Sequence, residues 1–261
     1  MLRTRLITAA ILLPTVLAIV LLAPPHAFTG FILLTTIWGL VETATMLDAN
    51  ILRASAIAVI GLVSACAVWS DPAALLWLPA AAIASACALV WIVGRRGAEA
   101  SRTLPGWRSL YPFWVGALFP YFAKLRNQPH GIVLILLMVL LVVASDSGAY
   151  FVGRALGRVK LLPRVSPHKT VEGALGGIAA SIAVALLLRH PLTPWMPAMI
   201  SAILGAAISL LAQVGDLANS AWKRLAGVKD SGWIFPGHGG LLDRTCSLVF
   251  PAVFSYYFLS R

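Results

Sequence analysis

The sequence predicts an all-α, polytopic integral membrane protein with about nine transmembrane helices. Only 11% of its 261 residues are charged, 60% are hydrophobic, and the mean hydropathy is +0.89. Soluble domains carry about 25% charged residues. Apolar runs of about 20 residues, enough to cross a hydrocarbon core about 30 Å thick, recur along the chain.

Nine apolar runs are expected to form the spanning helices. They lie at about residues 5–23, 27–46, 51–69, 73–94, 110–124, 131–152, 173–189, 197–215 and 245–260. The chain then divides by its polar content. Residues 1–130 form N-terminal transmembrane helices with few polar atoms, and residues 131–261 form a C-terminal transmembrane catalytic region whose polar loops face the cytoplasm.

The distribution of basic residues predicts the topology. The net charge of +11 could indicate a nucleic-acid-binding protein, but the placement of the charge argues for a membrane topology. With the N-terminus in the cytoplasm, sixteen of the twenty lysines and arginines fall on the cytoplasmic side; Lys124, Arg126, Arg189 and Arg261 fall on the other. This bias is typical of a multi-pass protein of a bacterial-type inner membrane. We therefore expect lipid, and not nucleic acid, as the partner of this charge.

Three polar islands in the second half are expected to be loops on the cytoplasmic face. They are "SDSGAYFVGRALGRVKLLPRVSPHKTVEGALGG" at 145–177, "QVGDLANSAWKRLAGVKD" at 213–230 and "PGHGGLLDR" at 236–244. Their convergence on one membrane face suggests a common site.

Each island contains an aspartate near an expected membrane boundary: Asp146, Asp216 and Asp243. An ionisable residue at such a place is costly unless it is paired, solvated or functional. Taken singly, Asp216 could cap a helix that carries "NSAWKRL", and Asp243 could pair with Arg244. Three converging aspartates favour a shared function instead.

Carboxylates beside basic side chains suit phosphate chemistry. The basic residues close to the aspartates are Lys169, Lys223, Arg224 and Lys229. Carboxylates hold Mg²⁺ together with substrate phosphates, and basic groups neutralise phosphate oxygens and a departing pyrophosphate. His238, in the "PGHGG" turn, could bind phosphate or transfer a proton; a loop histidine without chemistry is an equal alternative.

Two glycines four residues apart, Gly173 and Gly177, allow two interpretations. Glycine at this spacing lets transmembrane helices pack closely. A phosphate cradle is the alternative, but the sequence lacks the strand-turn-helix pattern that such a cradle needs. We expect helix packing. The three cysteines, Cys66, Cys87 and Cys246, are odd in number and lack metal-type spacing, so neither a disulfide framework nor a zinc site is predicted.

The segment "SAWKRLAGVKDSGWIFPGHGGLLDR", residues 220–244, resembles the signature of the membrane CTP:phosphatidate cytidylyltransferases, or CDP-diacylglycerol synthases. The matching residues are Ser220, Lys223, Arg224, Lys229, Asp230, Pro236, Gly237, His238, Gly239, Gly240, Asp243 and Arg244. "DSGAYFVGRALGRVKL", "SPHKTVEGALGG" and "GDL" at 215–217 also resemble family segments.

The resemblance implies an enzyme, often dimeric, that joins CTP and phosphatidate to give CDP-diacylglycerol and pyrophosphate. It implies Mg²⁺, with or without a second cation, held by Asp216 and Asp243. The implied catalytic residues are Lys169, Lys223, Arg224, Lys229, Asp230, His238 and Arg244. The implied substrate-binding residues are Ser166, Thr170, Ser220, Gly239 and Gly240.

Three positions depart from the family pattern. Cys246 stands where the family usually has aspartate, Asn219 where it has glutamate, and His168 where it often has lysine or glycine. A thiol is a poor ligand for Mg²⁺. The alternatives that these departures leave open are another lipid phosphate as substrate, a relative that has lost catalysis, and a transporter-like membrane protein.

Overall fold

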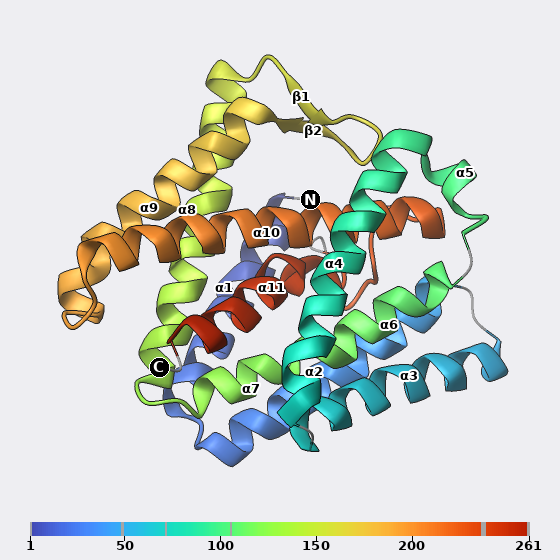
Figure 1. Ribbon diagram of the computed structural model, residues 1–261, viewed down its shortest axis with the longest axis horizontal. Helices are drawn as coiled ribbons and strands as arrows, with labels where there is room; N and C mark the ends of the chain where they lie inside the picture. The colour runs from blue at the N-terminus through green and yellow to red at the C-terminus, as the bar shows by residue number, and fades with distance from the viewer. Residues whose placement is uncertain (1, 48–49, 71, 105, 236–238, 260–261) are drawn as a thin grey trace.

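The computed structural model describes residues 2–47, 50–70, 72–104, 106–235 and 239–259 (Figure 1). Side chains are described from residue 10 onward, except those of residues 13, 51 and 72–75. The helices are α1 (Leu2–Leu22), α2 (Pro25–Met46), α3 (Ile51–Ser70), α4 (Pro72–Arg96), α5 (Ala98–Ser101), α6 (Trp107–Leu118), α7 (Pro120–Arg126), α8 (Gly131–Leu156), α9 (Val171–Leu192), α10 (Ala198–Ala226) and α11 (Leu241–Leu259). The two strands are β1 (Lys160–Leu162) and β2 (Ser166–Thr170), which form an antiparallel hairpin between α8 and α9.

The all-α, polytopic membrane class is confirmed. Six of the described helices are long and apolar enough to cross a membrane, namely α2, α3, α4, α8, α9 and α10. The expected number of nine is not confirmed. The run at 245–260 falls in α11, which is not among the six, and α1 is described with its side chains only in part.

The expected span at 110–124 is divided at Phe119 into two short helices, α6 and α7. Pro120 explains the break. Proline has no backbone N–H to continue the ladder, and its ring clashes with the carbonyl four residues earlier. Neither piece, of 12 and 7 residues, is long enough to cross the hydrocarbon core alone.

Glycines hold α8 and α9 close together, which confirms the packing interpretation. A Cβ added to Gly173 would lie 2.8 Å from the Ala149 carbonyl oxygen, and one added to Gly177 would lie 2.8 Å from that of Ser145. Only glycine permits this approach of the two backbones. The helix pair in turn supports the β1–β2 hairpin at one end (Figure 1).

Long-range contacts group the connecting segments into two ends. At one end, the His130 ring stacks on Trp195 at 4.5 Å between centroids, so the turns before α8 and before α10 lie together. At the other end, Arg102 Nε donates to the Leu225 carbonyl oxygen at 2.8 Å, and Arg164 donates to the Arg95 carbonyl oxygen. These contacts bring the ends of α4 and α10 close to the hairpin.

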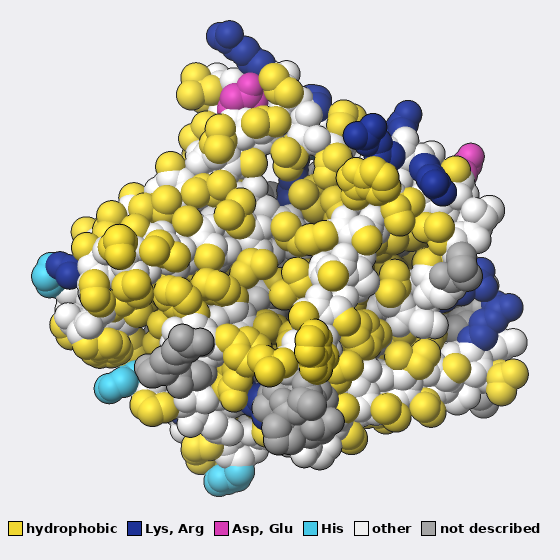
Figure 2. All heavy atoms as spheres, in the orientation of Figure 1, with side chains coloured by type: hydrophobic (Ala, Val, Ile, Leu, Met, Phe, Trp, Pro, Cys, Tyr) yellow, Lys and Arg dark blue, Asp and Glu magenta, His cyan; other side chains and the backbone are white. Residues whose placement is uncertain are grey.

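The surface agrees with this division into an apolar middle and polar ends. Figure 2 shows hydrophobic side chains over most of one face, across α8, α9, α10 and α4. Lysines and arginines gather near the hairpin and α5, at the top and right of the view. Such an apolar belt is expected of helices that face lipid.

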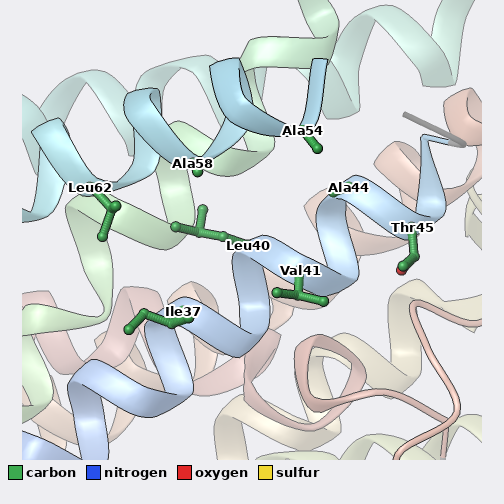
Figure 3. A pocket seen from close by; sticks show the side chains of 8 residues that line it. All are labelled: Ile37, Leu40, Val41, Ala44, Thr45, Ala54, Ala58 and Leu62. Atoms are coloured by element: carbon green, nitrogen blue, oxygen red, sulfur yellow. The ribbon is translucent and has the colours of Figure 1, made fainter. Parts of the chain in front are cut away.

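An apolar groove of about 530 Å³ lies between α2 and α3 (Figure 3). Its lining residues are Ile37, Leu40, Val41, Ala44, Thr45, Ala54, Ala58 and Leu62. None of these side chains is charged, so the groove supplies no group for phosphate chemistry. The charged groups converge elsewhere, on the other side of α2.

Candidate active site

The last third of α10 carries one row of site residues. The helix was expected to end near residue 215, but it continues to Ala226, so the second polar island is mostly helix. Asp216 is therefore an interior helical residue, and the expectation that it could cap a following helix is wrong. Positions 216, 220 and 223 are four and three residues apart, which places Asp216, Ser220 and Lys223 on one face.

The β1–β2 hairpin places a lysine beside this face of α10. Lys169, on β2, forms an ion pair with Asp216, with 2.6 Å between Nζ and Oδ2. The Asp216 side chain stays 41% exposed and that of Lys169 29% exposed. The pair is therefore open to a ligand that approaches from solvent.

The second ion pair is more deeply placed. Lys223 Nζ lies 2.5 Å from Asp243 Oδ1, and the Asp243 side chain is only 6% exposed. The ion pair that the structure describes for Asp243 is therefore with Lys223, whereas the alternative partner considered from the sequence was Arg244. Oδ2 of Asp243 accepts the Ser231 N–H at 2.7 Å and the Ser231 hydroxyl at 2.9 Å.

Asp243 also shapes the start of α11. It is the third residue of that helix, and its Oδ2 accepts the N–H of Gly240, the residue before the helix, at 3.2 Å. This contact is the carboxylate half of a capping box. Burial raises the pKa of the Asp243 carboxyl, but the Lys223 ammonium and the N–H groups of Ser231 and Gly240 outweigh burial and hold the pKa below its ordinary value. Asp243 is thus held as a carboxylate.

Helices α10 and α11 meet where the two ion pairs come together. A Cβ added to Gly215 would lie 2.2 Å from the Cys246 carbonyl oxygen, so the two backbones nearly touch there. The Cys246 thiol lies 3.8 Å from Asp216 Oδ1 and 3.6 Å from the Asp243 carbonyl oxygen. Cys246 thus lies between the Asp216 carboxylate and the backbone of Asp243.

Asn219 fills the space behind these aspartates. Its Nδ2 donates to Asp243 Oδ1 at 3.4 Å, and its Oδ1 accepts the hydroxyl of Tyr111 on α6. Both Asn219 and Tyr111 are buried. The position at which the family usually has glutamate is therefore a buried amide that supports Asp243.

Asp146 is the third predicted aspartate. It lies inside α8, four turns into the helix and within the span expected at 131–152, and the helix continues to Leu156. Its side chain is exposed and interacts electrostatically with Asp216 and Lys169. Asp146 is therefore a neighbour of the more exposed ion pair, Lys169–Asp216, which is called the outer ion pair below.

One acidic residue of the site, Glu42 on α2, was not expected from the sequence. This carboxylate is 4% exposed and accepts the N–H groups of Leu241 and Leu242 at 2.7 and 3.0 Å. It also accepts the Ser231 hydroxyl at 3.2 Å and the Trp38 indole N–H at 3.2 Å. One signal could have revealed it, because an acidic residue inside an apolar span is expensive unless it has partners.

The other predicted residues differ in their surroundings. Arg224, Lys229, Asp230 and Arg244 are exposed. Thr170 is buried, and its hydroxyl caps α9 by accepting the Gly173 N–H at 3.1 Å.

The remaining predictions fall on the hairpin, α10 and the turn before α11. Ser166 and Ser220 are half-buried, and Gly239, which has a φ of 81°, precedes Gly240 in the turn. His238, Pro236 and Gly237 lie outside the described residues. The substrate roles of all these residues stay predictions.

The chemistry of Asp216 and Asp243 fits a hard cation. Carboxylate oxygens are the ligands that Mg²⁺ prefers, and it is usually bound by one or two of them together with substrate phosphates. In this structure an ammonium group occupies an oxygen of each aspartate. Among the residues described, no group of three or more histidine, cysteine or acidic side chains is arranged to hold a metal ion. The protein ligands available to Mg²⁺ are therefore the carboxylates of Asp216 and Asp243.

Several curated bacterial proteins are similar to this chain. The chain is 40% identical over 156 residues to a phosphatidate cytidylyltransferase of Bacillus subtilis (strain 168), covering 59% of this chain and 58% of that protein. It is 44% identical over 137 residues to that of Staphylococcus epidermidis (strain RP62A), 52% of each chain. It is 40% identical over 169 residues to that of Synechocystis sp. (strain PCC 6803), 65% of this chain and 56% of that protein.

In each case the alignment spans little more than half the length of the relative. The model of the cytidylyltransferase family, by contrast, matches residues 3–261. Because that match takes in almost the whole chain, and the site residues lie within it, the protein belongs to the cytidylyltransferase family.

Proposed function

We propose that this protein transfers the cytidylyl group of CTP to phosphatidate, giving CDP-diacylglycerol and pyrophosphate. The similar proteins of three bacteria are named phosphatidate cytidylyltransferases, and this chain belongs to the same family. The observation that carries the proposal is the pair of ion pairs, Lys169–Asp216 and Lys223–Asp243, which Cys246 joins at the meeting of α10 and α11.

The arrangement suits a displacement at phosphorus. An oxygen of the phosphatidate phosphate forms a new bond to the α-phosphorus of CTP, while the bond from that phosphorus to the oxygen bridging to the β-phosphate breaks. Pyrophosphate leaves with that electron pair. Lys169 and Lys223 are placed to neutralise phosphate oxygens, and the exposed Arg224, Lys229 and Arg244 add positive charge around them.

We further propose that Asp216 and Asp243 hold Mg²⁺ when the nucleotide binds. Bound Mg²⁺ would neutralise charge on the transferring phosphoryl groups. The two lysines would then exchange a carboxylate for a phosphate partner, because metal and phosphate arrive together. The structure pairs each of these lysines with one aspartate.

We place this site on the cytoplasmic face of a bacterial-type inner membrane. The positive-inside bias of the sequence supports this orientation. The grouping of Arg102 and Arg164 with the ends of α10 and α4 supports it as well. A soluble nucleotide and an embedded lipid can meet only at such an interface. A homodimer is a further expectation from the family resemblance.

Purified protein in detergent, given labelled CTP, phosphatidate and Mg²⁺, is expected to form CDP-diacylglycerol. Asp216→Ala and Asp243→Ala should each lower the rate by about 100-fold or more, because each removes a charge that would organise the transferring phosphate. Product would be separated by thin-layer chromatography. Chelation of divalent ions with EDTA should abolish formation in the wild-type protein.

Glu99→Ala is the control, because Glu99 is an exposed acidic residue on α5, outside the site. Wild-type rates in both aspartate variants would refute the metal assignment. Product only with a different lipid phosphate would refute the proposed acceptor while leaving nucleotidyl transfer standing.

A further inference from the structure

We infer that Glu42 is a positioning residue, one that fixes the start of α11 and thereby the place of Asp243 in the active site. The inference rests on the proposed function and adds to it a residue from the N-terminal half of the chain. That half was expected to contribute only transmembrane helices.

Glu42 is buried among hydrogen-bond donors. It lies in α2, and 4% of its surface is exposed. A buried carboxylate is costly unless donors satisfy its oxygens. Three N–H groups do so: Trp38 Nε1 and Leu241 N on Oε1, and Leu242 N on Oε2. The Ser231 hydroxyl also lies against Oε2 and shares its one proton between Glu42 and Asp243.

Two of these donors are backbone N–H groups at the start of α11. The first N–H groups of a helix have no partner within the helix, and an acidic group beside them is favourable. Leu241 and Leu242 are the first two residues of α11. Glu42 therefore caps α11 from another helix, while Asp243 takes the N–H of Gly240 just before it.

Ser231 connects Glu42 with Asp243. The Ser231 hydroxyl lies within hydrogen-bond distance of both Glu42 Oε2 and Asp243 Oδ2, at 3.2 and 2.9 Å. Ser231 is itself buried. A side chain added to Gly240 would collide with Glu42, since its Cβ would lie 2.5 Å from Oε2. Gly240, the residue just before α11, thus lies tightly against the Glu42 carboxylate.

Glu42 touches neither the outer ion pair nor Lys223 among the contacts described, so its effect must pass through Ser231 and α11. A displacement of about 1 Å at a reacting centre can cost roughly 100-fold in rate. Loss of a partner that orients a metal ligand typically costs about 10- to 100-fold. We therefore expect a defect in turnover rather than in nucleotide binding.

The test is Glu42→Gln, compared with Glu99→Gln as the matched control. Glutamine keeps the shape of the glutamate side chain, but it replaces one carboxylate oxygen with an NH₂ group. That NH₂ group is itself a donor, so it cannot accept the hydrogen bonds that the replaced oxygen accepted. We expect kcat to fall by about 10- to 100-fold, with the KM for CTP near the wild-type value and with the control unchanged. Hydrogen exchange at the Leu241 and Leu242 amides, measured by mass spectrometry, should become faster in Glu42→Gln only.

Ser231→Ala provides a second, milder variant should Glu42→Gln not fold. It removes the hydroxyl between the two carboxylates, so kcat should fall with normal exchange at Leu241 and Leu242. Its effect should be non-additive with that of Glu42→Gln where the double variant folds, because contacting residues in one network couple. Unchanged kcat in both variants, or unchanged exchange in Glu42→Gln, would overturn the inference.

Failure of the proposed function would look different. The wild-type protein would then form no CDP-diacylglycerol, whereas the exchange rates at Leu241 and Leu242 would still report whether Glu42 holds the start of α11.

Discussion

Replacing Gly215 with alanine is expected to lower cytidylyl transfer by about 100-fold. The added Cβ would lie 2.2 Å from the Cys246 carbonyl oxygen and 2.9 Å from the Phe250 ring. A backbone carbonyl inside a helix cannot rotate away, so α10 and α11 must move apart. That movement separates Asp216 on α10 from Asp243 on α11, and both must act on one nucleotide. The rate would be measured with labelled CTP and phosphatidate.

The same substitution should also destabilise the protein. Inserting a methyl group where there is no space costs typically about 1–3 kcal/mol. The melting temperature in detergent should therefore fall modestly, while activity falls steeply. Gly30→Ala is the matched control, because a Cβ at Gly30, within α2, meets nothing within 4 Å. Gly215→Ala with wild-type activity would show that the close approach of α10 and α11 is not needed for the site.

The apolar helices could be predicted from the sequence because the signal is local. The expected runs at 27–46, 51–69 and 73–94 match α2, α3 and α4 to within two residues at each end. The expected ends of α8 and α10 were too early, by 4 and 11 residues. Hydropathy reports where apolar residues stop, whereas a helix can continue into polar surroundings, as α10 does through Asp216, Ser220 and Lys223.

The site could be predicted in its composition but not in its pairing. The sequence indicated that Asp216, Asp243, Lys169 and Lys223 converge, and the structure brings all four together. Which lysine meets which aspartate depends on the rotation of α10 and the reach of the β1–β2 hairpin, and neither is encoded in a local pattern.

Glu42 shows the limit of local patterns more clearly. Its partners Ser231, Leu241 and Leu242 are 189 to 200 residues away in the chain. No periodicity or motif links positions so distant. The only signal in the sequence was an acidic residue within an apolar run, and such a signal does not indicate which residues it contacts.

Replacing Cys246 with aspartate is expected to make both stability and turnover depend more strongly on Mg²⁺. The Cys246 side chain is buried, and its sulfur lies 3.8 Å from Asp216 Oδ1. A third carboxylate there would face Asp216 with no cation of its own. An uncompensated buried charge costs about 3–5 kcal/mol, so the variant should melt at a clearly lower temperature in EDTA. Added Mg²⁺ should restore much of this loss, because a ligand that binds only the folded state stabilises it.

Cys246→Asn separates the effect of charge from that of shape, since asparagine has nearly the same size as aspartate but is neutral. It should show little difference between EDTA and Mg²⁺, and turnover no higher than wild type. Cys246→Asp should exceed wild-type turnover at saturating Mg²⁺, because a hard oxygen replaces a thiol next to the proposed metal ligands. Cys246→Asp and Cys246→Asn could instead melt at the same temperature in EDTA and respond equally to Mg²⁺. That result would show that no cation binds between Asp216 and residue 246. The basic residues alone would then have to neutralise the departing pyrophosphate.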